Sequence, residues 1–126
     1  MRILLDTHVI IWFLDGNQKL LARHRHLIVS SDNEPLVSMA SLWELAIMMN
    51  IGKLNTPRTL SEILRSLQVQ EIDILPIMPG HTLQLTTLPF HHRDPFDRMI
   101  IAQALVERLP LITYDSIFAE YDLRVI

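Results

Sequence analysis

Short apolar segments alternate with longer helical patterns along nearly the whole chain, and this alternation is the strongest constraint on its fold. Strands separated by helices favour a parallel sheet with helices packed on both of its faces. We therefore predict an α/β fold, a three-layer α/β/α sandwich with a central, mainly parallel sheet. A chain of 126 residues is long enough for one sizeable core, so residues 1–126 are expected to form a single domain.

The individual elements follow from apolar spacing, capping residues, proline and glycine. Strands are expected at residues 2–6, 35–38, 72–75, 111–113 and 123–126. Helices are expected at 8–15, 18–29, 59–67, 79–87, 95–108 and 116–120, and one more begins after Ser38 or Ser41 and ends near Gly52. Thr59 and Glu62 have the spacing of a capping box.

The composition excludes several classes of protein. Hydrophobic residues make up 49% and charged residues 20%, which is typical of a soluble globular protein. The absence of cysteine excludes disulfides, thiol catalysis and cysteine zinc sites, and it suits a reducing cytosol. The sequence shows neither a signal-peptide pattern nor an apolar run of roughly 18 residues that could span a membrane. A cytoplasmic protein without membrane association is expected.

The formal net charge of −3 is unusual for a protein that binds nucleic acid through a basic surface. This charge weakens a nucleic-acid interpretation without excluding it. A group of carboxylates in an active site would itself lower the total, and a bound metal ion would offset it locally.

Two acids come at the carboxyl ends of predicted strands, which is where ligands bind in parallel sheets. Asp6 follows the first strand, and Asp115 follows the strand at 111–113. Each aspartate also has a purely structural interpretation as the N-cap of the helix that comes next. The sequence leaves both interpretations open.

Two further acids stand three residues apart at the start of the helix expected at 95–108. Pro95 disfavours a helical conformation at Asp94, so Asp94 is predicted to be the N-cap that accepts the backbone N–H of residue 97. Asp97 then lies in the first turn, where the helix dipole stabilises a carboxylate. Arg93 and Arg98 are candidates to pair with these acids or with a phosphate.

Glu44 lies in a helix that is apolar on nearly every side, and none of its neighbours one turn away is basic. It is either on a solvated strip of that helix or part of a functional site. A single divalent metal site is the simplest common explanation for all these acids. Oxygen ligands favour Mg²⁺ or Mn²⁺ over zinc, and the spacing of His8, His91 and His92 matches no zinc motif. His91 and His92 are expected to be solvated.

Four segments together resemble the PIN-domain ribonucleases, specifically the VapC-type toxins of bacterial toxin–antitoxin pairs. They are Leu4-Leu5-Asp6-Thr7-His8, Ser41-Leu42-Trp43-Glu44-Leu45, Asp94-Pro95-Phe96-Asp97-Arg98 with the helix through Ala104, and Ile112-Thr113-Tyr114-Asp115. The resemblance implies a PIN-like fold and the catalytic acids Asp6, Glu44, Asp97 and Asp115. It also implies that Asp6, Asp97 and Asp115 hold Mg²⁺, with Mn²⁺ as an alternative. Asp94 is an auxiliary position, and Thr7 and Thr113 would orient the acids.

The function implied by the resemblance is metal-dependent endoribonuclease activity, by hydrolysis of RNA phosphodiester bonds. The same resemblance implies a cognate antitoxin and a homodimer. A PIN-like module that binds RNA or protein without cutting is the alternative. A receiver domain is disfavoured because there is no lysine beyond Lys53, and a haloacid-dehalogenase-type phosphatase is disfavoured because Asp6-Thr7-His8 lacks the second aspartate. Core packing is the default expectation for five large apolar side chains, and those that are exposed would mark an interface. They are Trp12, Phe13, Trp43, Met48 and Met49.

Overall fold

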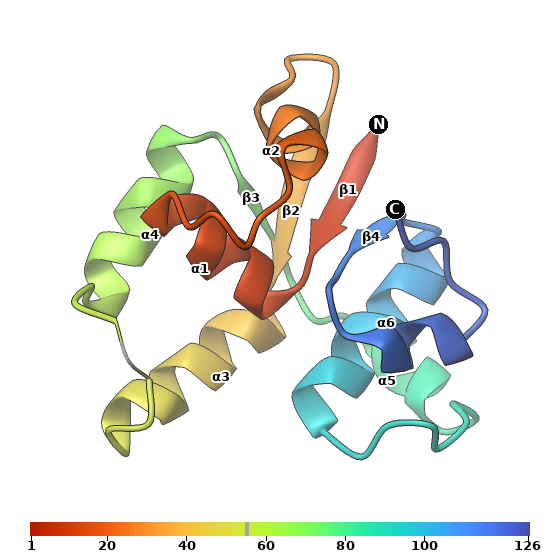
Figure 1. Cartoon of the computed structure of the whole chain (residues 1–126). Helices are drawn as coiled ribbons and strands as arrows, with labels where there is room; N and C mark the ends of the chain where they lie inside the picture. The colour runs from red at the N-terminus through yellow and green to blue at the C-terminus, as the bar shows by residue number, and fades with distance from the viewer. Residues whose placement is uncertain (55) are drawn as a thin grey trace.

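The computed structural model describes residues 1–54 and 56–126, which form a twisted parallel sheet between two layers of helices (Figure 1). The strands are β1 (Arg2–Leu5), β2 (Glu34–Ser38), β3 (Asp73–Leu75) and β4 (Leu111–Ile112). Their order in the sheet is β3-β2-β1-β4, and every neighbouring pair is parallel. The predicted three-layer α/β/α architecture is confirmed.

The helices begin and end where their capping residues allow. They are α1 (Thr7–Asp15), α2 (Ala22–Val29), α3 (Met39–Asn50), α4 (Leu60–Val69), α5 (Pro79–Leu85), α6 (Pro95–Glu107) and the 3₁₀ helix η1 (Ser116–Glu120). Ser38, rather than Ser41, caps α3 by accepting the N–H of Ala40 at 3.0 Å. The predicted capping box of Thr59 and Glu62 is present at the start of α4.

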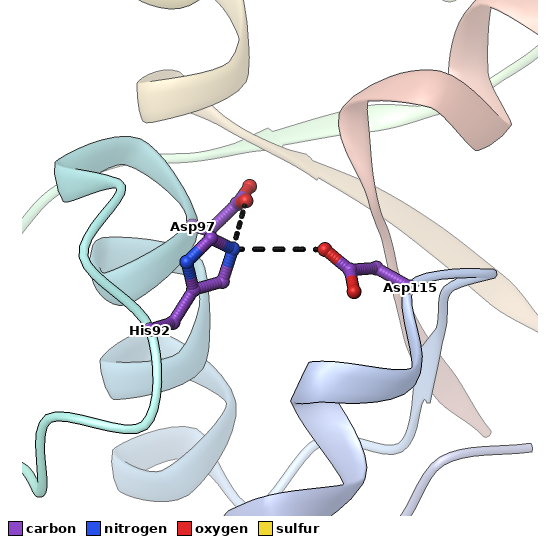
Figure 2. Close-up of side chains that lie close together, drawn as sticks. All are labelled: His92, Asp97 and Asp115. Atoms are coloured by element: carbon purple, nitrogen blue, oxygen red, sulfur yellow. Dashed lines mark ion pairs between the residues drawn. The ribbon is translucent and has the colours of Figure 1, made fainter.

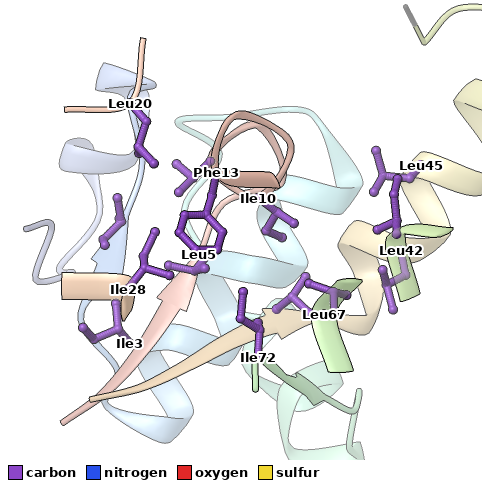
Figure 3. Close-up of a cluster of buried hydrophobic side chains, with 14 residues drawn as sticks. Ile3, Leu5, Ile10, Phe13, Leu20, Ile28, Leu42, Leu45, Leu67 and Ile72 are labelled. Atoms are coloured by element: carbon purple, nitrogen blue, oxygen red, sulfur yellow. The ribbon is translucent and has the colours of Figure 1, made fainter. Parts of the chain in front are cut away.

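The side chains of successive residues in each strand point to opposite faces of the sheet. One face buries Ile3 and Leu5 against α1, α2, α3 and α4 (Figure 3). The opposite face buries Leu4 and Leu111 against α6 and η1, where Phe118 is fully buried. Both sides of β1 are therefore apolar, and the first polar residue after it, Asp6, falls where the strand leaves the core.

Two expected elements differ from the structure. The helix expected at 18–29 begins only at Ala22, because Asn17 makes a turn in which its side chain accepts the N–H of Lys19 at 2.9 Å. The strand expected at 123–126 is reduced to one parallel bridge between Val125 and Leu111. Within the described ranges, every helix is too short or too polar to cross a membrane.

Candidate active site

Asp6 lies at the carboxyl end of β1 and caps α1. Its Oδ1 accepts the N–H of Thr7 at 2.7 Å, and its Oδ2 accepts the hydroxyl of Thr113 at 2.8 Å. The side chain is almost fully buried, and this burial raises the pKa of Asp6, although the two hydrogen bonds partly offset the effect. Asp6 is therefore both an N-cap and a desolvated carboxylate, so the two interpretations of the sequence hold together.

Asp115 is placed by the end of β4 in the same way. It caps η1 by accepting the N–H of Ile117 at 3.1 Å, and its own N–H donates to the hydroxyl of Thr113 at 3.2 Å. Thr113 thus connects the two acids, because the same hydroxyl donates to Asp6. These two hydrogen bonds are the contacts through which Thr113 would orient the acids, and that role stays a prediction.

Thr7 has a different set of contacts. Its hydroxyl donates to the Oγ of Ser41 at 2.8 Å, which ties the first turn of α1 to α3. This contact holds the helix that carries Glu44 beside the helix that Asp6 caps. Thr7 therefore acts on the relative position of these two helices.

Asp94 and Asp97 occupy the positions that the sequence predicts at the start of α6. Oδ1 of Asp94 accepts the N–H groups of Phe96 at 2.9 Å and of Asp97 at 3.1 Å, so Asp94 is the N-cap. Burial first, and then the nearby charges of Asp6, Asp94 and Glu44, together raise the pKa of Asp97 from 3.8 to about 7, against a lowering effect of His92. Asp97 is the point at which these acids interact most strongly.

Glu44 approaches this group from α3, which packs against α6. Burial raises the pKa of Glu44, the side chain of Thr7 lowers it, and the charges of Asp94 and Asp6 raise it. The side chain is half-buried, so the interpretation of Glu44 as part of a fully solvated strip is wrong. The helix pair brings a fourth acid to the ends of β1 and β4.

His92 is a residue of the site that sequence reasoning missed. Figure 2 shows its ring beside Asp97 and facing Asp115, with Nε2 at 2.7 Å from Oδ2 of Asp97 and 3.6 Å from Oδ2 of Asp115. The side chain is 20% exposed, so the expectation that His92 is solvated is wrong, whereas His91 is exposed as expected. The physical reason is the loop before α6, where the N–H of His92 donates to the hydroxyl of Tyr121 at 2.8 Å and turns the ring inward.

The ring nitrogens of His92 have distinct roles. Nδ1 accepts the N–H of Asp94 at 3.3 Å, which leaves the proton of the neutral ring on Nε2. Nε2 is buried and lacks a well-aligned hydrogen-bond acceptor, although Oδ2 of Asp97 is close. A protonated Nε2 is a donor rather than a metal ligand, so His92 is suited to hold the Asp97 carboxylate in place.

Arg98 does not take the role that the sequence suggested. Its guanidinium is buried and donates to the carbonyl oxygens of Leu88, Pro89 and His92, at 3.1, 2.8 and 3.2 Å. It also lies 3.9 Å from the ring centre of Phe90. The prediction that Arg98 pairs with the acids is wrong, because the carbonyl groups of the loop before α6 bind the guanidinium instead.

The acids therefore lie together without a lysine or arginine counter-ion among the described residues. Among residues 1–54 and 56–126, neither lysine nor arginine forms an ion pair with Asp6, Glu44, Asp94, Asp97 or Asp115. Asp6, Asp97 and Asp115 line one surface pocket of about 210 Å³, together with His8, Trp12 and Tyr114. Clustered carboxylate oxygens without a lysine or arginine partner, with the pKa values of Asp6, Glu44 and Asp97 raised by burial, are a donor set that fits a hard divalent cation.

Comparisons with known proteins agree with this architecture. In crystal structures, the chain is similar to VapBC2 from Rickettsia felis bound to a DNA fragment from its promoter, with a TM-score of 0.74, 16% identity, and coverage of 99% of this chain and 96% of the other. It is similar to DNA-bound VapBC from Salmonella typhimurium, with a TM-score of 0.73, 16% identity, and coverage of 100% and 97%. VapBC-1 from nontypeable Haemophilus influenzae has a TM-score of 0.68, 19% identity, and coverage of 100% and 97%.

These identities establish a shared fold. No curated protein matches the chain. The family model of the PIN domain, however, matches residues 3–123 and so spans all four acidic segments. The chain belongs to the PIN-domain family.

Proposed function

We propose that this protein is a metal-dependent endoribonuclease and the toxin of a toxin–antitoxin pair. The observation that carries the proposal is the convergence of Asp6, Asp97 and Asp115 on one pocket, where none of them forms an ion pair with a lysine or arginine of the described residues. Membership of the PIN family and the likeness to VapBC complexes support the same assignment.

In this proposal, Asp6, Asp97 and Asp115 hold Mg²⁺ or Mn²⁺, and Glu44 completes the acidic set from α3. When bound, the cation makes a water molecule more acidic and neutralises charge on the phosphate that reacts. Hydrolysis adds this water across a P–O bond of the RNA backbone, and the leaving oxygen takes a proton.

The protein's own residues do the positioning. Thr113 fixes the Asp6 carboxylate through its 2.8 Å hydrogen bond, and His92 restrains Asp97 from the other side at 2.7 Å. Asp94 contributes its negative charge, but its Oδ1 is occupied by two backbone N–H groups, so we assign it an auxiliary role. Preorganised carboxylates avoid the cost of reorganisation when the substrate binds.

The test is cleavage of total RNA by purified protein, with and without Mg²⁺, in comparison with Asp97→Asn. Metal-dependent cutting that the substitution abolishes is the expected result, and single-stranded DNA of matched length is the control for substrate class. Cutting that survives in Asp97→Asn would place the activity elsewhere. Binding of RNA without any cutting would favour the non-catalytic module.

We also propose that the protein forms a homodimer and that an antitoxin binds it. A stripe of apolar side chains at four-residue spacing runs along the exposed side of α3 and supports an interface there. Its members are Met39, Trp43, Ile47 and Ile51, which are 42%, 59%, 38% and 55% exposed. Sedimentation of Trp43→Ser beside the parent tests the homodimer, and an unchanged monomeric mass in both would refute it.

A further inference from the structure

The pocket that contains the acids has a second, aromatic wall with no role in holding a cation. His8 and Trp12 stand one turn apart on α1, and Tyr114 lies between Thr113 and Asp115. The rings of Trp12 and Tyr114 pack edge to face with centres 5.0 Å apart, and His8 is 6.2 Å from Trp12. A group bound to the acids in this pocket would lie beside these rings.

Hydrogen bonds hold the ring of Tyr114 in place. Its hydroxyl accepts the N–H of Leu21 at 2.8 Å and is hydrogen-bonded to Nδ1 of His24. Nε2 of His24 donates to the carbonyl of Ile126 at 2.9 Å, so Nδ1 is the unprotonated nitrogen and the tyrosine hydroxyl donates to it. Tyr114 is nevertheless 38% exposed. A fixed, partly exposed ring loses little conformational freedom when a ligand stacks on it.

A positive charge lies next to this wall. Nζ of Lys19 is 5.9 Å from the ring centre of Trp12, and Lys19 is exposed. The amino group can therefore move from the ring to a phosphate of a bound strand. The pocket and its rim thus offer carboxylates, aromatic faces and the amino group of Lys19.

The overall charge makes the aromatic wall important. At a net charge of −3, general attraction between the protein and a nucleic acid is weak. Stacking on aromatic side chains does not depend on basic residues and is tolerant of sequence, because every base has a π-face. A nuclease with this charge needs such contacts to retain its substrate.

We propose that His8, Trp12 and Tyr114 form a nucleobase-binding subsite that stacks the base beside the scissile phosphodiester. The proposal rests on the proposed function, since that function places a phosphodiester at the acids. It adds the part of the substrate that this surface recognises, which is an unpaired base rather than the sugar–phosphate backbone.

The chain has only two tryptophans, which makes a direct optical test practicable. Trp43→Phe leaves Trp12 as the single tryptophan, and Asp97→Asn in the same chain suppresses cutting. Fluorescence is titrated with a single-stranded RNA hexamer and, separately, with an abasic ribose-phosphate strand of the same length. We expect saturable quenching by the RNA and little or none by the abasic strand.

The affinity of Trp12→Leu for the RNA hexamer is measured beside Phe90→Leu, both in the Asp97→Asn chain. Loss of one stacked base weakens binding roughly 5- to 100-fold, and we expect this for Trp12→Leu only. Phe90 is the control because it is an aromatic residue that is 81% exposed and does not line the pocket. Trp12 also packs against the core, so the fluorescence titration, which leaves its ring unchanged, covers the case in which Trp12→Leu misfolds.

Equal quenching by both strands would overturn the subsite, as would unchanged RNA affinity in a folded Trp12→Leu chain. These outcomes are distinct from failure of the nuclease assignment. Base-dependent quenching in a protein that never cuts RNA supports the subsite and refutes the nuclease. Cutting of RNA by the parent without base-dependent quenching supports the nuclease and refutes the subsite. In that case the aromatic wall would instead be a surface for a protein partner.

Discussion

Asp97→Asn should stabilise the metal-free protein at neutral and alkaline pH. The native carboxylate is 18% exposed, is surrounded by Asp6, Asp94 and Glu44, and has His92 rather than a lysine or arginine beside it. Asparagine has nearly the shape of the protonated acid but never carries the charge. The substitution therefore removes the repulsion between ionised Asp97 and the neighbouring carboxylates in the folded protein.

The magnitude follows from the pKa of Asp97, which folding raises from 3.8 to about 7. At 1.36 kcal/mol per pH unit, this corresponds to roughly 4 kcal/mol of unfolding free energy. The folded state holds the proton of Asp97 more tightly than the unfolded state does. The stability that protonated Asp97 contributes is therefore fully present below pH 3.8 and is lost as pH rises through about 7. The variant should match the parent near pH 4 and exceed its stability by roughly 4 kcal/mol at pH 8.

The assay is urea unfolding in EDTA at several values between pH 4 and pH 8, for the parent and the variant. Burial lowers the pKa of His24, so His24 costs stability as pH falls below 6.5, but it does so equally in both proteins and cancels in their difference. Asp122→Asn, at an exposed acid, is the control for a simple change in net charge. A difference between parent and Asp97→Asn that stays constant from pH 4 to pH 8 would refute the reasoning.

Three further outcomes follow from the same contacts. Mg²⁺ or Mn²⁺ at a hundred times its dissociation constant should add about 2.7 kcal/mol of stability and raise Tm by roughly 10 °C, and an unchanged melting curve at millimolar metal would count against the site. Asp94→Ala removes the cap of α6 and should cost about 1 kcal/mol in urea unfolding, whereas Asp94→Asn keeps the cap and should cost much less; equal losses would contradict the capping role. Thr113→Val deletes the donor to Asp6 at nearly constant shape, so calorimetric titration should show weaker Mn²⁺ binding, and equal affinity would argue against the relay through Thr113.

The strand-end acids were predictable because local rules and the fold agree at those positions. An apolar strand that is buried on both faces must place its first polar residue at its end, and the ends of parallel strands share one edge of the sheet. Asp6 and Asp115 follow from this argument, and Asp94 follows from Pro95, which fixes the conformation of a capping residue. None of these placements depends on contacts distant in sequence.

The loop before α6 was not predictable in the same way. His92 was expected to be solvated, and Arg98 was a candidate to pair with the acids or with a phosphate. His92 instead lies beside Asp97, and Arg98 is buried and bound to carbonyl groups. The loop's conformation depends on the hydroxyl of Tyr121, which lies 29 residues beyond His92 in the sequence, and on carbonyl groups that only the folded loop presents to Arg98. Residue type and spacing do not encode such long-range contacts.

The carbonyl contacts of Arg98 explain why this arginine, which follows Asp97 directly in the sequence, does not pair with the acids. The guanidinium of Arg98 instead donates to three carbonyl groups. The ring that lies beside Asp97 is that of His92, which contacts the carboxylate through Nε2. A permanent cation next to the carboxylates would compete with a divalent ion, and the carbonyl contacts keep the guanidinium of Arg98 from taking that place. The arrangement lowers the stability of the metal-free protein, and it keeps the carboxylates available for the ion that the proposed hydrolysis requires.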